Sequence, residues 1–505
     1  MSSSLSYDPQ PARPAWGVRV EANKSMSMGE AIQIAPLPSE VRIPLDLSPT
    51  RIAEATVAPG DSVRTGQLIA RFPGPGGNAI CAPVTGRVRD IGPCSVPVAG
   101  DRQARCIIID SADADHWADE CKPPEAADSL SRESLQARIA QAGIVGLGGA
   151  LFPTADKLRI QTPVKLLILN GAECEPYITC DEMLMRERPE DVVHGAAIML
   201  RALGAQQAVI AVESDMPEAR IALKQALAAS KKTGIGVAVV TAKYPAGGER
   251  QLVELLTGQE VPLGGLPSDL GIVCQNVATA AAVSHLFRQG RPLISRIVTI
   301  TGSGIKQPGN IEARLGTPLR ELIAAAGGYT QPECQLYMGG PMMGIALDSD
   351  DLPVTEATNC LIVSTPREMS PPRPEFPCIR CGECSRVCPA RLMPQDLLNA
   401  CMNQDVERQA ALQVDACIEC GCCDYVCPSQ ITLTARFVQA KAQQRDWRQD
   451  QARAGEARER SDVHARRQAE RAEQYADGPK ADPVSGDQAL KDLMARLDER
   501  NRADD

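Results

Sequence analysis

The sequence contains no apolar run that approaches the roughly 18 to 20 residues needed to cross a bilayer. Its first stretch, Met1 to Trp16, also lacks the apolar core and basic flank of a secretory signal. The net charge is -10 and the pI is about 5.2, so the chain lacks the concentrated basic face that nucleic-acid binding requires. These absences predict a cytoplasmic protein without a nucleic-acid partner, whose contact with any membrane is peripheral.

Cysteine, in contrast, is abundant: the chain has 19, of which ten lie between Cys378 and Cys427 inclusive. Cytosolic thiols stay reduced, so a chain without an export signal is not expected to carry a disulfide framework. Metal binding is the better interpretation of the concentrated cysteines. The scattered cysteines, such as Cys81, Cys274 and Cys334, are interpreted as small buried hydrophobic residues.

The length of 505 residues exceeds the size at which one hydrophobic core stops growing, so several domains are expected. Short β-rich runs between Gly/Pro turns indicate a small β domain, and strand-length apolar runs that alternate with amphipathic stretches then indicate an α/β domain with a parallel sheet. The expected segments are a flexible N-terminus at 1–30, a barrel-sandwich-like β domain at 31–125, the α/β domain at 130–290, a β-grasp-like module at 291–345, a linker at 346–375, a helical cysteine-rich domain at 376–440, and a charged helical or disordered tail at 441–505.

The cysteine-rich segment contains one spacing written twice. The two copies are Cys378-x2-Cys381-x2-Cys384-x3-Cys388-Pro389 and Cys417-x2-Cys420-x2-Cys423-x3-Cys427-Pro428. A tight loop lets three thiolates converge on three corners of a cubane, while the fourth cysteine points to the other cluster. We therefore expect one [4Fe–4S] cluster on Cys378, Cys381, Cys384 and Cys427, and a second on Cys417, Cys420, Cys423 and Cys388.

Two structural zinc sites are the alternative, because four thiolates also suit Zn²⁺. Zinc ribbons pair one CxxC with a distant CxxC, whereas a third cysteine at the next x2 step and a following proline are typical of cubane ligation. Cys401 and Cys422 fall outside the ligand spacing and are interpreted as non-ligands.

A glycine-rich loop lies at the start of the predicted α/β domain, with four glycines within residues 143–149 and Lys157 beyond them. Such a loop lets backbone N–H groups approach a phosphate or a flat ring, with the lysine as counter-charge. Loops of this kind are also commonly plain turns, so the loop alone leaves ligand binding open.

The loop is one of several motifs that occur in a fixed order: GIVGLGGALFPTADKL, LILNGAECEPYITCDEMLMRE, KYPAGGERQL, CQNVATA and the doubled cysteine run. In this order they closely resemble the C subunit of the Rnf electron-transport complex, over nearly the whole chain from about Ile43 to Lys441. The α/β portion is also similar to the flavin- and NADH-binding subunit of respiratory complex I. The resemblance implies a Rossmann-like FMN/NADH domain, an SLBB module at 291–345 and a bacterial-type double-cluster ferredoxin domain.

The resemblance further implies a non-covalent FMN near the glycine-rich loop, with NADH as substrate. The residues expected to line this site are Gly146, Gly148, Gly149, Lys157, Asn170, Glu173, Tyr244, Gly247, Glu249, Gln275, Asn276 and Thr279. This sequence departs from the family pattern at Leu151, where glycine is usual, and at Arg250, Leu263 and Leu266. Glu175, Asp181 and Glu182 are interpreted as surface charges or helix caps.

The resemblance implies a peripheral electron-input subunit of an ion-translocating complex on the cytoplasmic face of the bacterial inner membrane. It would pass electrons between NADH and a ferredoxin-type partner through FMN and two [4Fe–4S] clusters. Its partners would be the other Rnf subunits, especially an iron–sulfur subunit, and it would contact the membrane only through them. The alternatives are an iron–sulfur relay or docking subunit with a vestigial flavin site, or the flavin subunit of a soluble hydrogenase or formate dehydrogenase.

Overall fold

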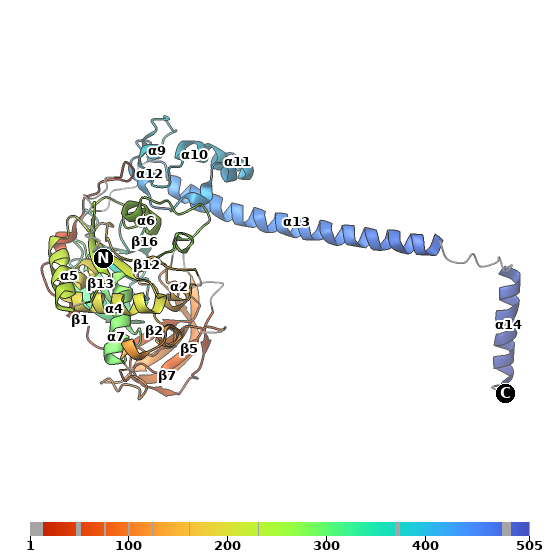
Figure 1. Ribbon diagram of the computed structural model, residues 1–505, viewed down its shortest axis with the longest axis horizontal. Coiled ribbons are helices and arrows are strands. Elements are labelled where there is room, and N and C mark those ends of the chain that lie inside the picture. Colours follow the sequence, from red (N-terminus) through yellow and green to blue (C-terminus); the bar gives the residue numbers. More distant parts are fainter. Residues whose placement is uncertain are drawn as a thin grey trace, which may run out of the picture. The chain divides into compact units, whose positions relative to one another are not determined.

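The computed structural model describes residues 14–46, 52–74, 77–98, 102–123, 126–160, 162–230, 232–368, 374–476 and 486–503. The chain divides into two units, Met1–Val438 and Gln439–Asp505. The first unit contains every described strand and every residue expected in a site. Figure 1 labels its elements and colours them along the sequence, from red at the N-terminus to blue at the C-terminus.

The β domain pairs its strands in two small sheets. Their orders are β2-β8-β7-β4 and β3-β5-β6. The strand bounds are β2 (Glu40–Pro44), β3 (Glu54–Ala55), β4 (Ser62–Val63), β5 (Leu68–Arg71), β6 (Ala79–Cys81), β7 (Gly86–Ser95) and β8 (Gln103–Ser111). Alternate residues such as Val41, Ile107 and Ile109 are fully buried, because one face of each strand points into the core.

One cysteine pair in this domain differs from the expected reduced thiols. Cys94 on β7 and Cys106 on β8 form a disulfide, with their Cα atoms 6.1 Å apart. The two strands pair antiparallel, which brings these positions within the distance that a disulfide can bridge.

The α/β domain has the expected parallel sheet, in the order β11-β10-β9-β12, and this prediction is confirmed. The bounds are β9 (Leu166–Gly171), β10 (Gln207–Glu213), β11 (Ile235–Val240), β12 (Ile272–Asn276), α1 (Arg132–Gln141), α2 (Thr154–Leu158), α3 (Cys180–Glu187), α4 (Pro189–Leu203), α5 (Pro217–Ser230), α6 (Glu249–Thr257) and α7 (Val277–Gln289). Leu167 and Leu169 pack in the main core, whereas Ile168 packs in a second cluster with Leu252 of α6. Both faces of the sheet are therefore covered.

Helices α4 and α7 pack closely and set the position of the site beside them. The α4 helix begins at Pro189, where a proline is well tolerated, and ends at Leu203, followed by Gly204, whose φ of 67° suits the left-handed C-terminal cap. The α7 helix begins after Asn276, whose side chain accepts a hydrogen bond from the Ala278 N–H. Gly195 of α4 faces the backbone of Ala280 of α7 without a side chain between them.

A six-stranded mixed sheet, in the order β1-β14-β13-β17-β15-β16, forms the third module. Its elements are β1 (Gln33–Ile34), β13 (Ser295–Thr301), β14 (Gly309–Arg314), α8 (Leu319–Ala325), β15 (Gln335–Met338), β16 (Ile345–Leu347) and β17 (Cys360–Ser364). The interpretation of 346–375 as a linker is therefore wrong over β17, which lies inside this sheet. The run Cys360–Val363 is fully apolar and buried, as an internal strand requires.

The N-terminal segment also differs from the expected mobile lead-in, of which residues 1–13 lie outside the described part of the chain. Trp16 and Val18 are buried, and Val18 pairs antiparallel with Tyr244. A short 3-10 helix follows at η1 (Lys24–Met26), and the Lys24 side chain donates to the Glu173 carbonyl oxygen. Residues 14–30 are held by these contacts because their few apolar side chains find buried partners in later parts of the chain.

The cysteine-rich segment forms α9 (Glu383–Val387), α10 (Pro394–Met402), α11 (Val406–Ala411), η4 (Val414–Ala416) and α12 (Cys422–Tyr425), which lie together in Figure 1. Its two copies share an unusual backbone. Gly382 and Gly421 take φ of 79° and 71° before α9 and α12, and Arg380 and Glu419 take φ of 56° and 60° two residues earlier. Equal spacing thus produces the same loop twice.

The second unit is helical over the residues that the structure describes. It contains most of α13 (Leu433–Ala476), which begins in the first unit, and α14 (Gly486–Ala503). Leu490, Leu493, Met494 and Leu497 of α14 are exposed. Among the described residues, none of the helices has both the length and the apolar character needed to span a membrane.

Candidate functional site

Two cavities in the cysteine-rich segment are each lined by cysteines from both sequence copies. Cys378, Cys381, Cys384 and Cys427 line the first cavity. Cys388, Cys417, Cys420 and Cys423 line the second, together with Cys422. The structure thus brings together the same two sets of four thiols that the spacing predicts, with the last member of each set supplied by the other copy.

Apolar side chains surround the thiols in an equally reciprocal way. Leu398 and Ile431 line the first cavity, and the residues at the matching places in the repeat, Phe437 and Leu392, line the second. Backbone N–H groups also reach the last thiol of each run: the Leu392 N–H lies 3.4 Å from Cys388 Sγ, and the Ile431 N–H lies 3.5 Å from Cys427 Sγ. Such donors stabilise thiolates and raise the potential of a bound cluster.

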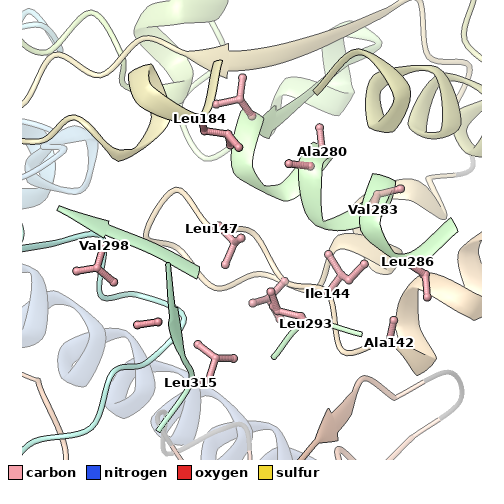
Figure 2. Close-up of a cluster of buried hydrophobic side chains, with 14 of the residues drawn as sticks. Ala142, Ile144, Leu147, Leu184, Ala280, Val283, Leu286, Leu293, Val298 and Leu315 are labelled. Carbon is pink, nitrogen blue, oxygen red and sulfur yellow. The ribbon is translucent and has the colours of Figure 1, made fainter. Parts of the chain in front are cut away.

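The glycine-rich loop is anchored at its base and open at its tip. Ile144 and Leu147 point into the core beside Val283 and Leu293, as Figure 2 shows. The loop closes through the hydrogen bond from the Gly146 N–H to the Phe152 carbonyl oxygen, 2.9 Å. Its base therefore belongs to the core, while residues 148–150 are exposed.

The tip of the loop leaves backbone donors available. The N–H groups of Gly148, Gly149 and Ala150 donate to no other residue in the part of the chain that the structure describes. A Cβ atom at Gly149 would meet no other atom within 4 Å, so the space beside it is open. Three successive unpaired N–H groups next to open space are suited to an anion or a ring edge.

The loop lies against the start of α7. The Leu147 N–H donates to Thr279 Oγ1 at 2.9 Å, and a Cβ at Gly148 would come within 3.3 Å of the Asn276 Cβ. The structure therefore brings the expected residues Gly148, Asn276 and Thr279 together. A side chain at 148 would press on Asn276, which would have to shift by a few tenths of an ångström.

The carboxyl ends of two neighbouring parallel strands add polar side chains at the same edge. Asn170, at the end of β9, donates from Nδ2 to the Gly247 carbonyl oxygen at 2.8 Å. Asn276, at the end of β12, donates to Asp181 Oδ2 at 2.6 Å. The ends of parallel strands are the usual ligand-binding edge of an α/β sheet, and here the side chains at that edge fix the surrounding loops.

Glu173 is buried, and its carboxylate is used inside the protein. It accepts hydrogen bonds from the N–H groups of Asp181 and Glu182 at the start of α3, at 3.0 and 3.2 Å, and from the Cys180 thiol. Burial raises the pKa of Glu173, and burial together with the nearby Glu173 charge raises the pKa of Asp181 to about 7. Glu173 therefore shapes the strand-end loop instead of presenting a free carboxylate.

Lys157 is paired within the expected site. Its Nζ lies 3.0 Å from Glu249 Oε1 and donates to the Cys274 carbonyl oxygen at 3.1 Å. Gln275 lies apart from these residues, because side chains alternate along β12 and its neighbour across the sheet is Leu169 of the main core. Gln275 Nε2 is buried and has no hydrogen-bond partner among the described residues.

Family comparisons add to this geometry. Residues 14–114 match the RnfC barrel sandwich hybrid domain, 139–285 the Nuo51 FMN-binding domain, and 297–346 the SLBB domain. The C subunit of the ion-translocating oxidoreductase complex of Rhodobacter capsulatus is 42% identical over 383 residues, which cover 75% of this chain and 73% of that relative. The chain belongs to the RnfC family.

A second relative has a similar sequence identity, but the matched residues cover a smaller share of its length. The RnfC protein of Pseudomonas aeruginosa is 43% identical over 446 residues, which cover 88% of this chain and 57% of that relative. An NAD+-reducing [NiFe]-hydrogenase in the H2-reduced state shares 20% identity at a TM-score of 0.44, over 63% of this chain and 62% of that one. This likeness is too weak to support an inference.

The residues that depart from the pattern expected of the RnfC family have different structural settings. Leu151 takes a φ of 51°, the left-handed region where glycine is favoured, so its backbone carries strain. Arg250 donates to three carbonyl oxygens, those of Val261, Pro262 and Gly265, and so fixes the following loop. Leu263 and Leu266 are 54% and 65% exposed.

Some polar residues of this RnfC chain have roles that sequence reasoning missed. Glu182 is buried, and Glu175 accepts hydrogen bonds from the N–H groups of Met342 and Met343, so the interpretation of these residues as surface charges is wrong. Tyr244 donates through its hydroxyl to the Cys420 carbonyl oxygen at 2.7 Å. No signal in the sequence connects residues that lie 176 positions apart.

Proposed function

We propose that this chain is a peripheral electron-input subunit of an ion-translocating oxidoreductase complex, which passes electrons between NADH and a ferredoxin-type partner through FMN and two [4Fe–4S] clusters. The observation that carries the proposal is the pair of reciprocal four-thiol cavities in the same unit as a segment that matches an FMN-binding domain. The names of the relatives support assignment to such a complex.

The thiol sets fit iron–sulfur clusters by the chemistry of their donors. The first cavity offers four cysteines and the second five, each in a mostly apolar lining, which suits a cubane and limits water near its sulfurs. Cys422 occupies the place of Glu383 in the other copy, so the repeat assigns the ligand role to Cys420 instead. When bound, the clusters supply one-electron carriers, while the surrounding apolar side chains and N–H groups tune their potentials.

The glycine-rich loop and strand ends fit FMN. Gly148 and Gly149 would hold the group through their unpaired N–H groups, and Lys157 would balance its phosphate charge once its ion pair with Glu249 opens. Asn170, Asn276 and Thr279 hold the loops around it. When bound, FMN supplies the exchange between hydride transfer and one-electron transfer, and the protein supplies position and electrostatics.

The partners follow from the same proposal. The chain would bind NADH and would dock on an iron–sulfur subunit of the complex, at the cytoplasmic face of the bacterial inner membrane. Membrane contact would be made only through those partner subunits. If the chain instead served a soluble hydrogenase or formate dehydrogenase, it would not sediment with the membrane fraction after gentle lysis.

Anaerobic purification with cofactor analysis tests the proposal. We expect about eight irons and eight acid-labile sulfides per chain, FMN released on acid precipitation, and bleaching of the flavin bands by NADH. Iron without flavin would support the alternative of a relay with a vestigial flavin site, for which the Lys157–Glu249 pair is the structural argument. Absence of iron under these conditions would reject the cluster proposal.

The exchange of fourth ligands has its own test. Cys388→Ala should abolish or alter the cluster of Cys417, Cys420 and Cys423, and should spare the cluster of Cys378, Cys381 and Cys384. Cys401→Ala is the matched control, because Cys401 lines neither cavity. Electron paramagnetic resonance of the reduced variants separates the two signals, and a change confined to the other cluster would reverse the assignment.

A further inference from the structure

Tyr244 lies where the candidate flavin loop meets the second thiol cavity. Its side chain is 3% exposed, and its hydroxyl donates to the carbonyl oxygen of Cys420 at 2.7 Å. Tyr244 also shares a small apolar cluster with Cys420, Cys422 and Val18. The hydroxyl is therefore held in a dry environment, where water cannot replace its hydrogen bond.

The backbone of Tyr244 reaches a second side of the same cavity through the N-terminal segment. Val18 and Tyr244 exchange two backbone hydrogen bonds of 2.8 and 3.1 Å, and the Gly17 N–H donates to the Val387 carbonyl oxygen at 2.8 Å. Val387 immediately precedes Cys388 in the chain. Two of the four expected ligands of the second cavity are thus linked to Tyr244: Cys420 directly, and Cys388 through Val18, Gly17 and Val387.

The other end of the same loop belongs to the candidate flavin site. Three residues after Tyr244, the Gly247 carbonyl oxygen accepts from Asn170, and the Gly247 N–H donates to Cys174 Sγ at 3.3 Å. A Cβ at Gly247 would lie 2.5 Å from the Ala172 carbonyl oxygen, so the loop packs tightly on the strand-end loop. Residues 244–249 therefore join the second cavity to the flavin site.

The first cavity has a different environment. Among the described residues, none of 244–249 lines either cavity, but Tyr244 bonds directly to Cys420 of the second, whereas Cys378 and Cys381 of the first are exposed. Cys420 and Cys423 of the second cavity are buried. The second cavity is thus the inner one, joined to loop 244–249 through Cys420, and the first is the more exposed, outer one.

We propose that Tyr244 is a positioning residue, which fixes the Cys420 loop against the flavin-site loop and sets the reduction potential of the cluster in the second cavity. The inference rests on the proposed function and goes beyond it, because it specifies which cluster adjoins the flavin. The Tyr244 hydroxyl donates to the Cys420 carbonyl oxygen and also lies beside the Glu175 carboxylate; its dipole toward the Cys420 loop would stabilise an added electron on a cluster held there. Removing it should make that cluster harder to reduce.

Tyr244→Phe tests the proposal in the full chain with its cofactors. Midpoint potentials are measured by redox titration followed by electron paramagnetic resonance, and the signals are assigned with Cys388→Ala. We expect a negative shift of the second-cavity signal alone, equivalent to about tenfold in the equilibrium constant for one-electron reduction, or about 59 mV. Tyr329→Phe is the matched control, since it removes a hydroxyl that donates to Asp350, away from the thiols.

Each outcome decides the question. If Tyr244→Phe instead loses about four irons while the first-cavity signal persists, the positioning role stands, because a folded chain has then lost only the inner cluster. Equal shifts of both signals, a shift of the first-cavity signal alone, or potentials matching those of Tyr329→Phe overturn the proposal. An unmodified chain without iron would reject the proposed function itself, whereas eight irons with no selective shift would reject only the role of Tyr244.

Discussion

Gly195→Ala provides a sharp test of how helix packing supports the flavin site. In an isolated helix this change is favourable by roughly 0.5–1 kcal/mol, because alanine is the better helix former. In this protein the new Cβ would lie 1.8 Å from the Ala280 carbonyl oxygen of α7. To reach even 3.0 Å, the shortest separation that real Cβ atoms show, α7 must retreat by about 1.2 Å.

This retreat acts on the loop as well as on the core. Thr279 precedes Ala280, and its Oγ1 accepts from the Leu147 N–H at 2.9 Å, so we expect the displacement of α7 to stretch or break this bond. Overpacking costs about 1–3 kcal/mol and the lost bond about 1 kcal/mol more. We expect the melting temperature to fall by roughly 5–10 °C. We also expect FMN affinity to fall about tenfold, which corresponds to about 1.4 kcal/mol.

The assays are thermal unfolding and fluorescence titration of the flavin-depleted chain with FMN. Gly236→Ala is the matched control. Gly236 lies in β11 of the parallel sheet in the same α/β domain, and a Cβ there would meet no atom within 4 Å. If Gly195→Ala melts as high as this control and binds FMN equally well, the close approach of α4 and α7 does not hold the loop and the reasoning is refuted.

Three further predictions concern strain, charge and a loop anchor. Leu151→Gly should be more stable than Leu151→Ala by about 1 kcal/mol in urea unfolding, because only glycine relieves the positive φ; equal stabilities would contradict this. Burial raises the pKa of Glu213 to about 8, so the folded state holds a proton that the unfolded state releases above about 4.5. Stability should therefore fall as pH rises from about 4.5 to 8, and Glu213→Gln should flatten this slope in melting curves; an unchanged slope would count against it. Arg250→Ala should speed amide hydrogen exchange about fivefold in residues 261–265, because three carbonyl contacts are lost, while exchange at the unchanged rate would show that the loop is held by other means.

The thiol sets could be predicted from the sequence because their information is local. A tight loop with fixed cysteine spacing determines its own backbone, and the similar φ values at Arg380 and Glu419 show that the same spacing gives the same loop twice. The parallel sheet was likewise predictable, since strands that are buried on both faces read as continuous apolar runs. Both the cysteine spacing and the apolar runs can be recognised in the sequence without knowing which distant segments are in contact.

Contacts between distant segments could not be predicted. The run Cys360–Ser364 reads as a short apolar stretch inside an expected linker, and only its pairing with β13 and β15 makes it an inner strand. Glu175 and Glu182 read as surface charges because charged residues are rarely buried, and the partners of Glu175 are backbone groups that leave no sequence pattern. The bond from Tyr244 to Cys420 is of the same kind.

The stretch between Gly17 and Ile34 contacts three modules in succession. Gly17 and Val18 join the cysteine-rich segment to the flavin-site loop, and Lys24 donates to the strand-end loop. Strand β1 then extends the sheet of the third module. A fragment that begins at residue 130 would leave the Glu173 loop without its cation and the edge of β14 without a neighbour. None of these modules is therefore structurally independent of the N-terminal segment. Any recombination that moved one of them into another flavoprotein would have to carry the beginning of the chain along with it.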